Sequence, residues 1–151
     1  MSVTTGQPVT GHPVPQGLYV SARRHRDLIY TSGMTPRRDG VLQFSGQIQA
    51  TDALDSHRDA VRLATGNALT AARAQLQPDE AITAVLQLTV FLNAAADFTA
   101  HARFADYASQ LLAEELGEDC IGSRAAIGVA SLPSNAPVEV TLIAVAETKQ
   151  G

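Results

Sequence analysis

Two charged residues, Arg124 and Glu139, stand in apolar, strand-like runs near the end of the chain. They belong to the segment SRAAIGVASLPSNAPVEV, in which a Leu-Pro-Ser-Asn-Ala-Pro turn separates the two runs. A charged side chain in an apolar strand costs desolvation free energy unless a partner group meets it. The two residues therefore either pair with each other, as a cross-strand ion pair worth roughly 0.2–1 kcal/mol if it is exposed, or face a ligand.

The other residue types that could do chemistry show no comparable pattern. Cys120 follows Glu118 and Asp119, and acidic neighbours disfavour the thiolate, so we do not expect a nucleophile there. No metal site is predicted, because the histidines are scattered and no two of them stand four residues apart. They are His12, His25, His57 and His101.

Size, charge and cysteine content narrow the class of protein. A chain of 151 residues that is 45% hydrophobic can form one ordinary domain with its own core. The single cysteine cannot form an internal disulfide, which favours a reducing, cytoplasmic location. The formal net charge of −4 argues against nucleic acid as a partner. There is neither a basic-then-apolar leader nor a long apolar run, so we expect no secretion and no membrane insertion.

Two short basic clusters interrupt this acidic balance, at residues 23–26 and 37–38. Each lies between strand-like runs, where a solvated turn is the ordinary interpretation and an RNA contact the alternative.

Turn residues and apolar periodicity predict the elements that must position Arg124 and Glu139. Residues 1–17 are rich in Gly and Pro, which predicts an extended N-terminal arm, and a single domain then spans 18–151. Asp52 can cap the first of two amphipathic helices, which ends before Pro78. The second helix ends at Gly117. The predicted strands cover 18–22, 28–32, 41–44, 84–93, 124–131 and 138–147, and the helices cover 52–77 and 98–116.

The predicted order βββαβαββ groups strands rather than alternating them with helices, which favours an α+β fold with both helices on one face of a six-stranded sheet. No helix is left for the second face. An apolar sheet face needs cover, so we predict that the chain forms a homo-oligomer.

These features together resemble the RidA family, also called the YjgF/YER057c/UK114 family, over roughly residues 18–147. The similarity rests on Tyr19, on TSG at 31–33, on LTVFLN at 88–93 and above all on the closing RAAIGVASLP and VEVTLIAV. It implies a chorismate-mutase-like fold, an antiparallel-rich mixed sheet and a homotrimer with ligand clefts between subunits.

The resemblance also implies roles for five residues. Arg124 would bind the carboxylate of a small imine or enamine acid, and Glu139, fifteen residues later as in the family, would hold the hydrolytic water. Tyr19 and Ser32 would line the substrate pocket, and the backbone of Ala126 would orient the substrate.

Two positions depart from the deaminating members, which places the chain in a less characterised branch of the family. Ala126 stands where those members commonly have Cys. Their second helix also carries an Asn, for which this chain offers His101, Ala102 or Tyr107. Of these, His101 can form hydrogen bonds through its ring nitrogens.

The implied activity is hydrolytic deamination of small 2-imino and 2-enamino carboxylic acids, such as 2-aminoacrylate, to 2-keto acids and ammonia, with neither a metal nor an organic cofactor. Three alternatives stay open. The chain could bind small carboxylate metabolites without turnover, or catalyse a pathway-specific hydrolysis in the same cleft. The least favoured alternative is a ribonuclease or translation inhibitor, an activity attributed to some relatives.

Overall fold

A five-stranded sheet forms the centre of the molecule in the computed structural model, which describes residues 13–149. The first twelve residues of the expected N-terminal arm lie outside the described residues, and residues 13–17 form neither a helix nor a strand. The strands run in the order β1-β2-β7-β5-β6, and only the β5-β6 pair is parallel. Their bounds are Ala22–His25, Leu28–Thr31, Val138–Thr148, Glu80–Asn93 and Ser123–Val129, in that order.

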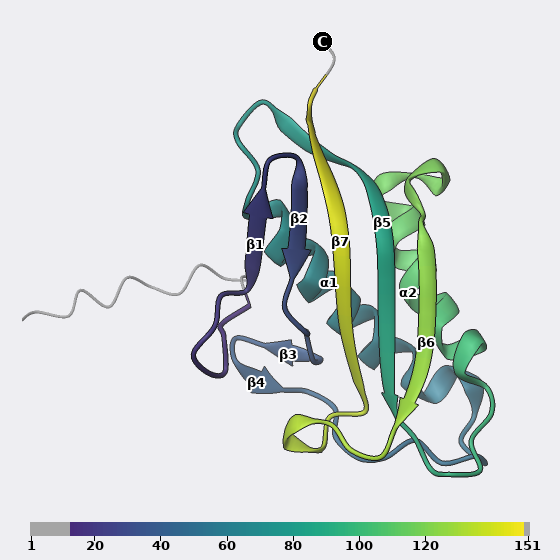
Figure 1. Ribbon diagram of the computed structural model, residues 1–151. Helices are drawn as coiled ribbons and strands as arrows, with labels where there is room; N and C mark the ends of the chain where they lie inside the picture. The colour runs from purple at the N-terminus through teal and green to yellow at the C-terminus, as the bar shows by residue number, and fades with distance from the viewer. Residues whose placement is uncertain (1–12, 150–151) are drawn as a thin grey trace, which may run out of the picture.

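Both helices, α1 (Arg58–Arg73) and α2 (His101–Leu116), cover the same face of this sheet, as Figure 1 shows. Alanines dominate the buried stripe of α1, so its backbone can approach the strands closely. The side chains of β7 that face the helices, from Val138 to Ala146 at every second position, are all buried. The α+β layer arrangement expected from the sequence is therefore confirmed.

The opposite face of the sheet is only partly covered in the single chain. The intervening residues of β7 are half-buried, and Tyr30 of β2 and Ile127 of β6 expose 48% and 41% of their surface. Exposed apolar side chains in one region of a sheet are typical of a protein interaction surface.

The start of the fold differs from the prediction in its details. Strand β1 begins at Ala22 rather than at residue 18, so the basic cluster that we expected in a solvated turn lies largely within a strand. The physical reason is a partner distant in sequence: Arg24 donates hydrogen bonds of 2.6 and 2.7 Å to the two carboxylate oxygens of Glu80.

The expected third strand is also different. Residues of the second basic cluster form β3 (Arg37–Arg38), which pairs with β4 (Val41–Leu42) in a separate two-stranded sheet, so the central sheet has five strands and not six.

The first helix begins later than predicted. A 3-10 turn, Leu54–His57, precedes α1, and Asp52 does not cap it. The Asp52 carboxylate instead accepts hydrogen bonds from the backbone N–H of Gln49 at 2.9 Å and from His57 Nε2 at 2.8 Å.

Candidate functional site

Arg124 and Glu139 are separated by strand β5 in the folded chain. Strands β6 and β7 pair with opposite edges of β5, so they do not form the hairpin that the intervening turn suggested. Arg124 pairs with Leu88, whose side chain is buried beneath the helices, and Glu139 pairs with Phe91, three residues further along. Side chains alternate between the faces of a sheet, so Arg124 faces the helices and Glu139 faces the open side. The two residues therefore do not form an ion pair within one chain.

The guanidinium of Arg124 is held against helix α2 by three hydrogen bonds. One Nη atom donates to Asp106 Oδ1 at 2.8 Å and to Ser109 Oγ at 3.0 Å, and the other donates to the carbonyl oxygen of Ala102 at 3.2 Å. Asp106 is well exposed, with 58% of its side chain accessible, so this is a surface ion pair of low stabilisation. The arrangement fixes the direction of the Arg124 side chain at the outer edge of the sheet.

A shallow groove runs beside Arg124 between strand β6 and the start of α2. Arg124, Ala126 and Gly128 stand at every second position of β6, so all three lie on the same face of the sheet. His101, the first residue of α2, covers the far end: a Cβ atom added to Gly128 would lie only 2.5 Å from His101 Nε2. The residues lining the groove are Thr99, His101, Ala102, Arg124, Ala126, Ile127 and Gly128.

The position of His101 in this groove is held by packing. Its ring meets the ring of Phe98 edge to face, with centroids 4.8 Å apart. Among the described residues, no hydrogen bond joins a His101 ring nitrogen to another group, so both nitrogens can serve a ligand. Sequence analysis named His101 only as one of three candidates on its helix, and it missed Asp106 and Gly128. The sequence does contain a signal for Gly128: it is a residue without a side chain two places after Ala126.

Glu139 lies on the open face, against the backbone of Gly33. A Cβ atom on Gly33 would approach the Glu139 carboxyl carbon to 2.6 Å, so only glycine permits this contact. Burial raises the pKa of the Glu139 carboxyl above its ordinary value of 4.5. Within residues 13–149, no cation lies within ion-pair distance of it. A carboxylate in such a setting can accept a proton near neutral pH more readily than an ordinary surface carboxylate.

Tyr19 and Ser32 lie near Gly33 rather than near Arg124. The Ser32 hydroxyl donates a 2.6 Å hydrogen bond to the carbonyl oxygen of Val20, so its proton is already engaged. Tyr19 exposes 47% of its surface, and its hydroxyl oxygen accepts a 2.9 Å hydrogen bond from the backbone N–H of Gln16. The predicted site residues thus fall into two groups, one containing Arg124, Ala126 and His101, the other Glu139, Ser32 and Tyr19.

Across residues 13–149, no three His, Cys, Asp or Glu side chains gather as metal ligands would. The Cys120 sulfur lies 3.0 Å from the carbonyl oxygen of Thr83 and 3.2 Å from that of Leu116. In these residues, no helix has both the length and the apolar character that a membrane span requires.

Comparison with known proteins relates this arrangement to a widespread fold. The model of a family described as Endoribonuclease L-PSP matches residues 10–146. A Trypanosoma cruzi protein, TCP17, is 32% identical over 114 residues, which cover 74% of this chain and 71% of the relative.

Solved structures show the same architecture. Atu1372 from Agrobacterium tumefaciens, a protein of unknown function, is 31% identical with a TM-score of 0.76, covering 87% of this chain and 83% of that one. TdcF from Escherichia coli, solved with bound serine, is 22% identical with a TM-score of 0.66, covering 89% and 93% of the two chains.

Proposed function

The chain belongs to the Endoribonuclease L-PSP family, which is also the RidA/YjgF family, and from this membership we propose that it hydrolyses small 2-imino and 2-enamino carboxylic acids to 2-keto acids and ammonia. The observation that carries the proposal is the groove along β6, where the fixed guanidinium of Arg124 and the ring of His101 line one open space above the small residue Ala126. His101 forms no hydrogen bond through its ring within residues 13–149.

The complete site in this proposal lies between two copies of the chain in a homotrimer. One subunit supplies Arg124, Ala126 and His101, and its neighbour supplies Glu139, Ser32 and Tyr19. Two features support this division: Arg124 and Glu139 face opposite sides of the sheet, and the open face that carries Glu139 is partly apolar. Burial of that face against another subunit would remove apolar surface from water.

Each residue has a defined task in the proposed reaction. Arg124 binds the substrate carboxylate through two parallel N–H···O bonds, which places the neighbouring C=N carbon above Ala126. Glu139 accepts a proton from a water molecule as its oxygen adds to that carbon. Collapse of the resulting carbinolamine breaks the C–N bond, the departing nitrogen takes up a proton and leaves as ammonia, and the 2-keto acid remains.

His101 is positioned, in this account, at the nitrogen end of the substrate. Its ring can exchange a proton with the imine or amine nitrogen while Arg124 holds the carboxylate. An enamine substrate is first protonated on carbon to give the imine. Because water is the only co-reactant, the proposed hydrolysis requires neither a redox nor a group-transfer cofactor. The single Cys120 leads us to propose a reducing, cytoplasmic location.

The test of this proposal is the rate at which 2-iminopropionate or 2-aminoacrylate, generated in the cuvette by an amino-acid oxidase or a dehydratase, disappears. We expect wild-type protein to exceed the spontaneous rate and the Arg124→Ala and Glu139→Gln variants to fall back to it. A wild-type rate equal to the spontaneous one with several side chains would overturn the proposal.

A second candidate, a binder of small carboxylates without turnover, is favoured by one observation: among residues 13–149 no carboxylate lines the groove, and Asp106 beside it already pairs with Arg124. For such a protein, Glu139→Gln would leave both binding and the background hydrolysis rate unchanged. Ribonuclease activity is a third candidate, because the family is described as Endoribonuclease L-PSP. RNA cleavage that persists on purification and disappears in Arg124→Ala would support that function.

A further inference from the structure

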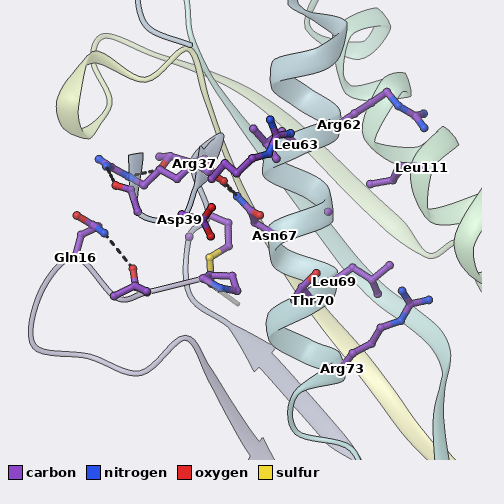
Figure 2. A pocket seen from close by; sticks show the side chains of 18 of the residues that line it. Gln16, Arg37, Asp39, Arg62, Leu63, Asn67, Leu69, Thr70, Arg73 and Leu111 are labelled. Atoms are coloured by element: carbon purple, nitrogen blue, oxygen red, sulfur yellow. Dashed lines mark hydrogen bonds between the residues drawn. The ribbon is translucent and has the colours of Figure 1, made fainter. Parts of the chain in front are cut away.

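A second cavity, of about 340 Å³, lies on the helix-covered side of the sheet, as Figure 2 shows. Helix α1 forms one wall, and the β3-β4 hairpin together with the segment that carries Gln16 forms the other. Its volume is at the lower end of the range for small-molecule sites.

The cavity is distinct from the groove at Arg124. Helix α2 separates the two: Arg124 contacts its residues Ala102, Asp106 and Ser109, whereas Leu111 and Glu115, on the side toward α1, line the cavity.

Positive charge is concentrated around this cavity, although the chain as a whole is acidic. Four of the eleven Lys and Arg residues line it, but only two of the fifteen Asp and Glu residues do. These six residues are Arg37, Arg38, Arg62 and Arg73, with Asp39 and Glu115. A concave surface lined by one sign of charge concentrates ions of the opposite sign.

The existing ion pairs leave part of this positive charge available. Arg62 donates to Glu114, at 2.6 Å for the shorter hydrogen bond, and Arg73 lies 3.6 Å from Glu115. In the described part of the chain, Arg37 donates to three neutral oxygens, namely Thr35 Oγ1, the Gly40 carbonyl and Ser134 Oγ. Counting Asp39, Glu114 and Glu115 against the four arginines leaves one excess positive charge.

Arg38 is the residue best able to bind an anion. Its side chain is exposed, and among residues 13–149 it takes part in no ion pair. It lines the cavity together with Asn67 of α1, whose side chain Figure 2 shows reaching the hairpin.

The floor of the cavity is apolar because it consists of Gly66 of α1, which has no side chain, and of the leucine side chains beside it. A Cβ atom at this position would make an ordinary contact, 3.7 Å, with Leu111 Cδ2 of α2, so alanine fits there and a larger side chain must enter the cavity. Leu63 and Leu111 flank this open position. The cavity thus combines an apolar floor with a cationic rim.

We propose that this cavity binds a small organic monocarboxylate, with its charged group at Arg38 and its apolar body over Gly66. The single excess positive charge matches one carboxylate, and the guanidinium fork matches its two oxygens. Tyr19, which the proposed hydrolysis also uses, lines one side of this cavity, but Arg38 and Gly66, which carry the binding, have no part in that reaction.

The experiment is a titration of the full-length protein with benzoate, followed by calorimetry and by amide NMR shifts, with the uncharged benzamide as the matched probe. We expect benzoate to bind and benzamide to bind far more weakly, and the amides of Gly66 and Asn67 to shift. Arg38→Gln raises the dissociation constant about tenfold, as the loss of a charge-assisted hydrogen bond does.

Two pairs of matched variants, at Gly66 and at Arg38 with Arg103, test whether benzoate binds in this cavity. Gly66→Leu abolishes benzoate binding and Gly66→Ala retains it, while Arg103→Gln, which removes a charge from α2 outside the cavity, has no effect. The amide shifts of Gly66 and Asn67 report on this cavity and not on the groove at Arg124. Equal shifts of these amides with benzoate and benzamide, or benzoate-induced shifts that survive both Arg38→Gln and Gly66→Leu, would overturn the proposal. Because Arg38 is exposed, its variant keeps the test valid should Gly66→Leu fail to fold.

Discussion

Arg124 and Glu139 face opposite sides of one sheet and are separated by strand β5, to which their own strands pair on either edge. Arg124 is turned toward helix α2 and held by Asp106, whereas Glu139 lies on the open face against Gly33. Both cannot therefore act on one small substrate within a single chain. This separation is the basis of the proposal that the active site forms between subunits.

Replacement of Asp106 is expected to strengthen carboxylate binding at Arg124. The Asp106 carboxylate competes with a ligand for the guanidinium, while Ser109 and the Ala102 carbonyl continue to hold it in place. Because the pair is exposed, we expect Asp106→Asn to lower the dissociation constant of a substrate analogue only about threefold. Calorimetry measures the change, with Asp97→Asn as a control of equal charge. Weaker binding by Asp106→Asn would show that the carboxylate positions Arg124 instead of competing with its ligand.

Gly128 is predicted to be required for the position of His101. In Gly128→Ala the new Cβ would lie 2.5 Å from His101 Nε2, so the ring must move out of the groove. We expect hydrolysis to slow about a hundredfold, at the lower end of the range for a lost proton-transfer group, with little change in melting temperature. The measurement is a double-mutant cycle with His101→Ala. If Gly128→Ala slowed both backgrounds equally, its effect would not pass through His101.

Glu139 is expected to lower the stability of the fold at neutral pH. Burial raises its pKa in the folded chain, so between the unfolded and folded pKa values the folded state binds more protons, and stability falls as pH rises through that window. Glu139→Gln removes this loss. We predict a higher melting temperature for the variant at pH 7, with the two proteins converging below the ordinary carboxyl pKa of 4.5. A variant less stable than wild type at pH 7 would contradict this explanation.

The ion pair between Arg24 and Glu80 has the opposite pH dependence. Hydrogen bonds from Arg24 lower the pKa of Glu80 to about 2, so the stability that Glu80 contributes is present above its unfolded pKa and is lost as pH falls toward 2. We expect Glu80→Gln to reduce the melting temperature by a few degrees at pH 7 and the difference to shrink in acid. Glu118→Gln, an exposed control, should show no such trend. A difference that stayed constant with pH would assign the effect to packing.

Local patterns were sufficient to predict the layer architecture. The grouped order of the strands and the apolar periodicity of the two helices predicted an α+β fold with both helices on one face of a sheet, and this arrangement is present (Figure 1), with five strands in the sheet instead of six. Local patterns failed where a distant partner decides the outcome. Strand β1 includes Arg24 because Glu80, far along the chain, meets its charge.

The separation of Arg124 from Glu139 by strand β5 could not be predicted from the sequence for a similar reason. A short turn between two apolar runs is typical of a hairpin, but β5 lies between β6 and β7 in the sheet. The pairing of those strands depends on long-range contacts that no local pattern records. The groove partners Asp106 and Gly128 were missed because helix α2 and strand β6 come together only in the folded chain.

The most direct test of the central claim is activity in mixed oligomers of Arg124→Ala and Glu139→Gln subunits, prepared by co-expression. Each variant alone should be inactive toward 2-iminopropionate. In randomly mixed oligomers about a quarter of the interfaces combine an intact Arg124 from one subunit with an intact Glu139 from the next, so we predict about a quarter of wild-type activity. Mixed oligomers as inactive as either variant alone would contradict a site shared between subunits.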